Sequence, residues 1–182
     1  MAKIEQFQLK PVCFDELQVI LNWRNSERIK SWMYTDHQIS WKEHVEWFHN
    51  VQEDPSKRVL VLHGKGRPLG VVNFTDIQKR NARCYWGFYI GDEKAPKGSG
   101  TIMGILALDK IFHEMQINKV CSEVIATNQA SYRFHQKFGF EMEGRLKNHI
   151  WKNQHYLDVI QMALFANKWK HHRLNLLKDL EG

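Results

Sequence analysis

A short loop at residues 97–101 places two glycines and two hydroxyl side chains between an apolar strand and an apolar helix. Glycine lets neighbouring backbone amides converge on one point, and the next helix adds unpaired amides and the positive end of its dipole. Such a loop binds anions, and a pyrophosphate fits it. A plain loop before a helix has a similar composition, so both interpretations stay open. The loop residues are Lys97, Gly98, Ser99, Gly100 and Thr101.

Two polar residues interrupt apolar strands and are candidates for catalysis. Glu123 lies in the apolar segment 120–125, where burying a carboxylate is costly unless the group is paired or used chemically. A carboxylate there can act as a base, directly or through water, but it can also form a salt bridge or face solvent. Asn73 lies in a valine-rich strand, where its amide can hold a catalytic water or satisfy a bulge.

The spacing of apolar residues predicts the elements that position these groups. Ser40 and Glu43 have the spacing of a capping box, and Gly139 stands where a helix takes a left-handed residue. The order strand, glycine loop, helix, strand over residues 83–126 predicts a βαβ crossover. The fold class is therefore α/β: a mixed, mostly antiparallel sheet with helices on both faces. Helices are expected at 13–26, 40–53, 101–115 and 128–138, and strands at 58–63, 68–75, 83–90, 119–126, 141–151 and 156–166.

The chain is long enough for one domain with its own core, since it has 182 residues of which 43% are hydrophobic. We expect a single domain at residues 1–167 and a basic, helical tail at 168–182. The tail fits a solvated helix or a docking surface for phosphate or nucleic acid. No base-reading motif accompanies it, so no nucleic-acid partner is expected. The basic cluster consists of Lys168, Lys170, His171, His172 and Arg173.

The net charge of +6 favours an anionic ligand without identifying it. Cys13, Cys84 and Cys121 are widely spaced among apolar or aromatic neighbours, which indicates buried free thiols in a reducing compartment. No signal-peptide pattern and no long apolar run is present, so a cytoplasmic protein that does not enter a membrane is expected. The histidines are scattered, and no metal site is expected.

The second half of the chain carries a motif that extends over four elements. The aromatic strand at 83–90, the loop K-G-S-G-T, the strand at 120–127 and the pattern N-x-x-S-x-x-F-H-x-K-x-G-F at 128–140 resemble the acetyl-coenzyme A binding core of the Gcn5-related N-acetyltransferases. The sequence E-G-R at 143–145 and Asp158 resemble the closing strands of that family. The resemblance implies a sheet of about seven strands with splayed middle strands. It also implies direct acetyl transfer from acetyl-CoA to an amine in a ternary complex, without a metal.

The resemblance implies how acetyl-CoA is held. The backbone of Phe88, Tyr89 and Ile90 pairs with the pantetheine arm, and one of these amides faces the thioester carbonyl, where it stabilises the developing oxyanion. The amides of residues 97–101 hold the pyrophosphate, and the side chain of Asn128 reaches the pantetheine. The family also has a glutamate at the position of Glu123.

His135 departs from the family pattern, which usually has a tyrosine four residues before the glycine of this motif. The family tyrosine lies by the coenzyme sulfur and is thought to protonate the leaving thiolate. An imidazolium can serve as that acid, because its ordinary pKa of about 6.5 lies below the value of about 8.5 for a thiol. There are three alternatives. His135 only packs in the core, Tyr132 one helical turn earlier acts as the acid instead, or solvent protonates the thiolate.

The amino-terminal half resembles one group within the family. The elements W-R-N at 23–25, W-M-Y-T at 32–35 and I-S at 39–40 resemble the acetyltransferases of bacterial pseudaminic acid synthesis. Those enzymes acetylate the 4-amino group of a UDP-linked 4-amino-4,6-dideoxy-N-acetyl-altrosamine. The resemblance implies that Arg24, His44 and Arg145 bind the diphosphate and sugar, and that Trp32, Tyr34 and Tyr89 offer flat faces to uracil or sugar. Asn25 and Thr75 belong to the same acceptor set.

Three alternatives are consistent with the same residues. A ribosomal-protein or polyamine acetyltransferase shares the closing strands, but a cationic acceptor favours an acidic cleft, and the candidate acceptor residues here are basic or aromatic. The third alternative is a binding module, which holds coenzyme A without turnover and docks a partner through the basic tail. A homodimer is common in folds of this kind, although no interface can be read from the sequence.

Overall fold

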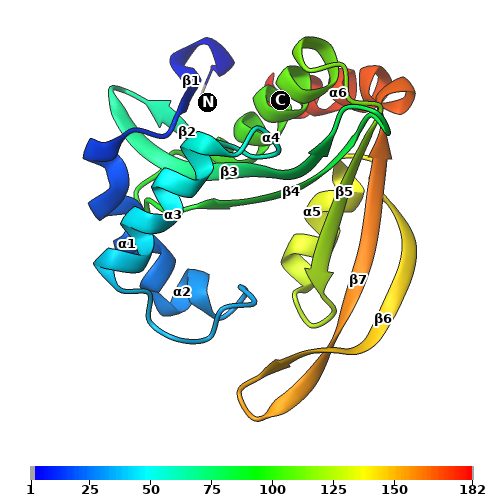
Figure 1. Cartoon of the computed structure of the whole chain (residues 1–182). Coiled ribbons are helices and arrows are strands. Elements are labelled where there is room, and N and C mark those ends of the chain that lie inside the picture. The colour runs from blue at the N-terminus through cyan, green and yellow to red at the C-terminus, as the bar shows by residue number, and fades with distance from the viewer. Residues whose placement is uncertain (1–2, 182) are drawn as a thin grey trace.

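A seven-stranded sheet organises the chain, with the strand order β1-β2-β3-β4-β5-β7-β6 (Figure 1). The computed structural model describes residues 3–181. Neighbouring strands are antiparallel except β4 and β5, which are parallel. The predicted α/β class with one parallel crossover is confirmed. The strands are β1 (Phe7–Pro11), β2 (Arg58–Gly64), β3 (Arg67–Gln78), β4 (Arg83–Ile90), β5 (Lys119–Ile125), β6 (Glu141–Lys152) and β7 (His155–Phe165).

Helices cover both faces of the sheet, with α1, α2 and α3 on one side and α4 and α6 together on the other (Figure 1). The strand β1 and the helix α2 were not predicted from the sequence, and the helix expected at 101–115 is an α-helix continued by a π-helix. The helices are η1 (Ile4–Gln6), η2 (Phe14–Glu16), α1 (Leu17–Asn25), α2 (Glu27–Lys30), α3 (Trp41–Glu53), α4 (Ser99–Asp109), η3 (Lys110–Glu114), α5 (Gln129–Lys137) and α6 (Ala166–Glu181).

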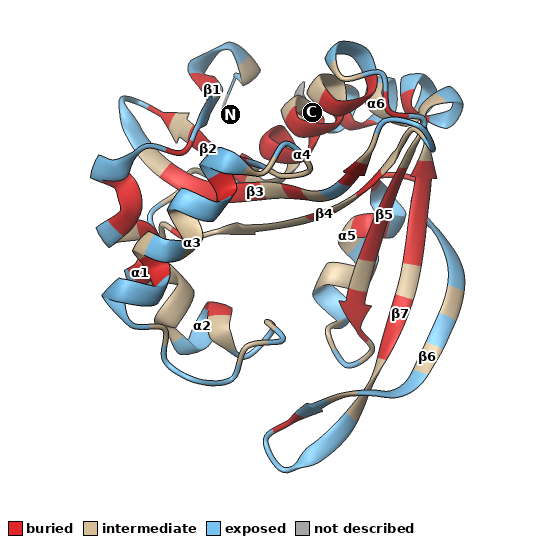
Figure 2. Cartoon of the chain, viewed as in Figure 1, coloured by how far each residue is buried: buried red, intermediate tan, exposed pale blue. Residues whose placement is uncertain are grey.

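The central strands are apolar on both faces because each face supports its own core. In β2, Leu60 and Leu62 belong to the core shared with α4 and α6, whereas Val59 and Val61 belong to the core shared with α1 and α3. Successive strand residues point to opposite faces, so a continuous apolar run fills two cores. Buried residues are concentrated in the middle of the sheet, and β6 at the edge is mostly exposed (Figure 2).

The two predicted helix boundaries are present in detail. The Glu43 amide donates to Ser40 Oγ at 3.3 Å, and Glu43 Oε2 accepts from the Ser40 amide at 2.7 Å, which completes the capping box of α3. At the end of α5, Gly139 has φ 88°, and the Phe140 amide donates to the His135 carbonyl at 3.0 Å. This geometry is a Schellman motif, which requires a left-handed residue at the position of Gly139.

Replacing Ser40 with alanine is expected to lower the free energy of unfolding by about 1 kcal/mol, because the first turn of α3 loses an acceptor for one of its orphan amides. Chemical denaturation measures this change. Lys42→Ala is the control on the same turn, since its side chain lies at the surface with a distant 3.9 Å ion pair to Glu46. Equal stability of the two variants would show that the capping box does not contribute.

Helix α6 is packed against the domain rather than set apart from it. The Trp169 side chain is fully buried and stacks on Phe138, and Leu176 belongs to the same core. Some of the basic side chains in this segment have acidic partners within the fold: Lys168 pairs with Glu141, and Arg173 pairs with Asp109 at 2.8 Å. These pairs leave the segment with less free positive charge than its sequence indicates.

One of the three cysteines differs from expectation. Cys84 and Cys121 are buried in strands, and burial raises the pKa of the Cys84 thiol to about 12. Cys13 is exposed, so its prediction as a buried thiol was wrong. The reason is local, because Cys13 precedes η2 and its amide donates to Glu16 Oε2 at 3.1 Å, which holds the residue in a surface turn.

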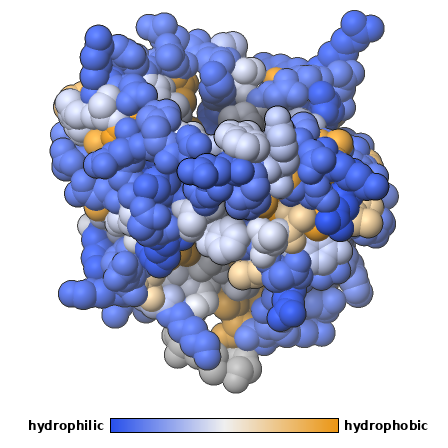
Figure 3. Space-filling view, turned by 90° about the horizontal axis from the view of Figure 1, so that it is seen from below, coloured by the Kyte–Doolittle hydropathy of each residue, from blue (hydrophilic) through white to orange (hydrophobic). Residues whose placement is uncertain are grey.

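The surface seen from below is mostly hydrophilic, with apolar side chains only in small, separate patches (Figure 3). Within residues 3–181, none of the helices combines the length and the apolar composition that crossing a bilayer requires.

Candidate active site

The parallel strands β4 and β5 stay together for only part of their length and then separate (Figure 1). Their register pairs Arg83 with Lys119 and ends at Tyr85, which pairs with Cys121. Beyond Tyr85, β4 is paired with β3 alone, so its main-chain groups on the side of β5 have no strand partner. Unpaired backbone groups at this depth need another partner, and an extended ligand can supply it.

A cavity of about 1210 Å³ occupies the region where the two strands separate. Both strands contribute to its wall, together with α3, the start of α5 and the segment that follows α2. The cavity therefore brings together most of the residues that the sequence indicated for catalysis and for the acceptor. These are Arg24, Trp32, Tyr34, His44, Asn73, Thr75, Phe88, Tyr89, Glu123, Asn128 and His135.

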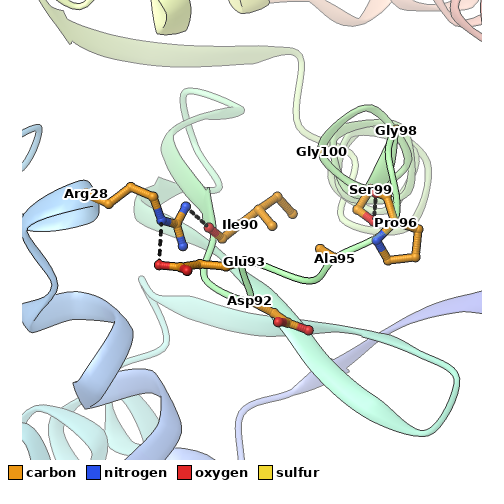
Figure 4. A pocket seen from close by; sticks show the side chains of 9 residues that line it. All are labelled: Arg28, Ile90, Asp92, Glu93, Ala95, Pro96, Gly98, Ser99 and Gly100. Atoms are coloured by element: carbon orange, nitrogen blue, oxygen red, sulfur yellow. Dashed lines mark hydrogen bonds and ion pairs between the residues drawn. The ribbon is translucent and has the colours of Figure 1, made fainter.

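The glycine loop forms a second, adjoining cavity of about 530 Å³ (Figure 4). Gly98 has φ 91° and is the N-cap of α4, a conformation that glycine adopts without strain. Gly98, Ser99 and Gly100 line this cavity together with Ile90, whereas Lys97 and Thr101 are not among its lining residues. The first turn of the eleven-residue helix α4 borders this hollow, and a helix start can hold an anion. The Ser99 amide is already bonded to the Pro96 carbonyl at 3.0 Å, and Asp92 and Glu93 also line the hollow.

Arg28 joins the two cavities and was missed by the sequence analysis. Its Nη1 donates to the Ile90 carbonyl at 3.0 Å, its Nη2 donates to the Gly91 carbonyl at 2.5 Å, and its Nε lies 3.7 Å from Glu93 (Figure 4). The side chain lines both cavities. No sequence signal could have found this contact, because Arg28 and Ile90 are 62 positions apart.

Glu123 lies in the cavity wall and is bonded to the predicted acceptor segment. The Tyr34 hydroxyl donates to Glu123 Oε2 at 2.8 Å, and Gln161 Nε2 lies 3.5 Å from Oε1. Burial, and then the bond to Glu123, raise the pKa of Tyr34 well above its usual range. Tyr34 is therefore a neutral hydrogen-bond donor that holds the carboxylate in one orientation.

Two buried side-chain nitrogens in the cavity wall have no hydrogen-bond partner among residues 3–181. These are Nη1 of Arg24 and Nε2 of His44. Burial lowers the pKa of both side chains, and Arg24 also opposes the charging of His44. His44 is 4% exposed and stacks on Trp47 with ring centroids 4.9 Å apart. A buried guanidinium without a partner is costly, so this part of the cavity favours a ligand with anionic or oxygen-rich groups.

His135 is enclosed in the core at the wall of the cavity, with 3% of its surface exposed. Its Nδ1 lies 2.7 Å from the Ser131 carbonyl, so this nitrogen carries the proton. Its Nε2 accepts from Trp86 Nε1 at 3.2 Å and lies 2.7 Å from Ser122 Oγ. Burial lowers the pKa of His135 to about 4, against a small opposing effect of the Ser131 bond. This neutral ring differs from the imidazolium that an acid role requires.

Asn73 and Asn128 are held by their strand and helix. Asn73 pairs with Gly87 across β3 and β4, and a Cβ at Gly87 would lie 3.1 Å from Asn73 Oδ1. Glycine at 87 therefore leaves room for the amide of Asn73 beside the cavity. Asn128 Oδ1 accepts from the Ser131 amide at 3.0 Å and caps α5, so the Nδ2 group of Asn128 is its donor toward a ligand.

Two predicted acceptor residues lie outside the cavity lining. Arg145 is exposed on β6 and is bound to Asp158 Oδ2 through both Nε and Nη2 at 2.7 Å. Asn25 brackets the Ile39 main chain, donating to its carbonyl at 2.8 Å and accepting from its amide at 2.9 Å. Asn25 thereby ties α1 to the segment before α3. The structure gives both residues partners within the chain and does not bring them to the other acceptor residues.

Within the part of the chain that the structure describes, no group of three or more His, Cys, Asp or Glu side chains is arranged to hold a metal ion.

Comparisons with known proteins agree with this geometry. The Acetyltransferase (GNAT) domain family matches residues 6–141. Spermidine N(1)-acetyltransferase of Escherichia coli (strain K12) is 22% identical over 169 residues, which cover 93% of this chain and 91% of that protein. Acetyltransferase PseH of Campylobacter jejuni (strain 81-176) is 25% identical over 125 residues, covering 69% of this chain and 76% of that protein.

A solved structure is similar over nearly the whole fold. The crystal structure of spermidine N-acetyltransferase from Vibrio cholerae in complex with CoA and spermine superposes with a TM-score of 0.85. The match covers 91% of this chain and 99% of that chain at 23% identity. The chain therefore belongs to the GNAT family and is an acetyl-CoA-dependent N-acetyltransferase.

Proposed function

We propose that the enzyme acetylates the 4-amino group of a UDP-linked 4-amino-4,6-dideoxy sugar, as in pseudaminic acid synthesis. The observation that carries this proposal is the pair of unpartnered buried nitrogens in the cavity, the donor Arg24 Nη1 and the ring nitrogen Nε2 of His44. A diphosphate supplies the acceptor oxygen that Arg24 Nη1 needs, and a sugar hydroxyl can pair with His44 Nε2 in either tautomer of the ring. The partial match to acetyltransferase PseH supports the same acceptor.

Three carboxylates line the cavity, which a polycation would favour, and each lies near a partner within the chain. Glu43 is bonded to Ser40 and lies 3.0 Å from His37 Nε2, and these bonds lower the pKa of its exposed carboxyl to about 2. Glu46 lies 3.9 Å from Lys42, and Glu123 accepts from Tyr34. A polyamine would have to compete with these partners while it approached the buried Arg24.

Acetyl-CoA is proposed to lie along the splayed edge of β4. The main-chain groups of Phe88, Tyr89 and Ile90 that face away from β3 pair with the pantetheine, except the Ile90 carbonyl, which already accepts from Arg28, and Asn128 Nδ2 donates to it. The pyrophosphate is proposed to lie at the start of α4, beside Gly98, Ser99 and Gly100. This arrangement directs the thioester toward the larger cavity, where Glu123 and Asn73 are located.

In the proposed reaction, the neutral amine of the acceptor attacks the thioester carbonyl carbon and forms a C–N bond. An amide of β4 stabilises the oxyanion of the tetrahedral intermediate. The intermediate collapses with cleavage of the C–S bond, and the thiolate of CoA leaves. The nitrogen loses a proton to Glu123, directly or through a water held by Asn73, and the thiolate takes up a proton, so the products are the amide and CoA thiol.

Acetylation of spermidine is the second candidate, and the relatives of that name favour it because their matches span most of the chain. Purified enzyme is to be assayed for thiol release from acetyl-CoA with UDP-4-amino-4,6-dideoxy-N-acetyl-altrosamine, spermidine or an amino-terminal peptide. We expect release with the UDP-sugar alone. Release with spermidine or peptide only would overturn the proposed acceptor, and tight CoA binding without release would favour a binding module.

Arg24→Gln is expected to raise the KM for the UDP-sugar about tenfold, because one charge-assisted hydrogen bond is lost. The KM for acetyl-CoA should change by less than about twofold, since Arg24 lies on the acceptor side. Steady-state kinetics with each substrate varied in turn measures both values. Arg80→Gln, at an exposed loop position, is the matched control. If spermidine is the acceptor instead, removing this cation lowers its KM, and the opposite sign refutes the proposal.

A further inference from the structure

Lys152 is a buried lysine at the far end of the β6–β7 hairpin, and only 2% of its surface is exposed. Its Nζ donates to the carbonyls of Lys30 at 3.2 Å, Met33 at 2.8 Å and Thr35 at 3.4 Å. An ammonium has three donors, and here each donor has one main-chain acceptor. The three carbonyls belong to the end of α2 and the segment behind it, 117 to 122 positions away in the sequence.

The hairpin is built to hold this lysine in place. Asn153 and Gln154 at its turn have φ 51° and 65°, the pair of positive values that a tight type I′ turn requires. Trp151 and Tyr156 face each other across the strands with ring centroids 4.8 Å apart. A short turn and a cross-strand aromatic pair fix the direction in which Lys152 leaves the sheet.

The segment that Lys152 holds carries part of the acceptor site. Trp32, Met33, Tyr34 and Thr35 line the larger cavity, and the Tyr34 hydroxyl donates to Glu123. The contacts therefore run from the hairpin, through the main chain of residues 30–35, to the carboxylate on β5. Helix α2 has only four residues, so it gives this segment little stability of its own.

We propose that Lys152 is a positioning residue that holds residues 30–35 closed over the acceptor side of the cavity and so sets the geometry between Tyr34 and Glu123. It acts through main-chain carbonyls and not on the reacting atoms. The proposal rests on the assignment of the larger cavity as the acceptor site, but not on the identity of the acceptor.

Three variants test the proposal with the acceptor that supports turnover in the unmodified enzyme. Lys152→Met keeps the length of the side chain and removes the donors, Lys152→Arg keeps charge and donors, and Lys147→Met is an exposed control on the same strand. The readouts are the KM of each substrate, kcat, and amide hydrogen exchange of residues 31–36.

We expect Lys152→Met, which removes three donors to main-chain carbonyls, to raise the acceptor KM about tenfold and to lower kcat several-fold. The KM for acetyl-CoA should stay within about twofold, and exchange should accelerate at 31–36 but not in the central strands. Lys152→Arg should recover most of the acceptor KM, and Lys147→Met should behave as the unmodified enzyme.

An unchanged acceptor KM and unchanged exchange at 31–36 in Lys152→Met would overturn the proposal, as would an equal rise in both KM values. If Lys152→Met does not fold, Lys152→Gln, which retains an amide donor, takes its place under the same criteria. Failure of the proposed acceptor appears separately, as absence of turnover with the UDP-sugar in the unmodified enzyme.

Discussion

Glu123→Gln is expected to lower kcat about 100-fold, because the attacking amine then loses the carboxylate that we propose takes its proton. Glutamine keeps the size of the side chain and an acceptor for the Tyr34 hydroxyl, so the wall of the cavity should be preserved. The KM for acetyl-CoA should stay within about twofold, because its proposed contacts are on β4 and the glycine loop. Thiol release with the preferred acceptor measures kcat directly.

The pH dependence gives this prediction a second readout. In Glu123→Gln, activity should recover partly as pH rises, since an amine that has already lost its proton needs no base. Tyr34→Phe keeps the carboxylate but removes its 2.8 Å donor, so it reports the contribution of orientation alone. Glu53→Gln, exposed at the end of α3, is the control for removing a carboxylate elsewhere. A loss of less than about threefold in Glu123→Gln would exclude proton abstraction by this carboxylate.

The parts of the fold that depend on near neighbours in the sequence could be predicted from it. The strand at 83–90 matches β4 residue for residue, and the capping box at Ser40 and the left-handed glycine at 139 are present. Capping and helix termination are decided within one turn of chain, so their signals are complete in a short window. The crossover that carries the glycine loop follows from the order of such local elements.

Long-range contacts supply what the sequence could not indicate. Arg28 meets the carbonyls at the end of β4, and Lys152 meets those behind α2, although neither residue belongs to a motif. Arg145 was expected at the acceptor, but Asp158 lies beside it across the β6–β7 pair and engages its guanidinium. The four-residue helix α2 is too short to leave a periodic signal, so it was absent from the predicted elements.

His135 shows most clearly how burial changes the meaning of a residue type. The sequence indicates an imidazole in place of a phenol, and an ordinary pKa near 6.5 makes that group a reasonable acid. In the structure its pKa is about 4, because the charged ring would lose its hydration in the core. At pH 7 only about one ring in a thousand is then protonated, so a resident imidazolium is a poor source of protons for the thiolate. Of the alternatives, protonation by solvent is then favoured over Tyr132, which is not among the residues that line the larger cavity.

The lowered pKa of His135 also predicts how the fold responds to acid. The unfolded chain takes up a proton near pH 6.5 and the folded chain only near 4, so stability from this residue is complete above pH 6.5 and is lost as pH falls toward 4. With 1.36 kcal/mol for each unit of pKa difference, the loss amounts to about 3 kcal/mol. Urea denaturation at several pH values between 7 and 4 measures it.

His135→Gln is expected to be less stable at pH 7, because Ser122 and Trp86 lose a matched acceptor, but its stability should fall less steeply between pH 6.5 and 4. His49→Gln, at an exposed position of α3, is the control and should keep the dependence of stability on pH that the unmodified protein has. The other histidines are present in all three proteins, so their contributions cancel when the slopes are compared. Parallel slopes in all three proteins would mean that folding does not lower the pKa of His135. In that case kcat of the unmodified enzyme should decline as pH rises through the pKa of His135, and the role of imidazolium acid would regain its physical basis.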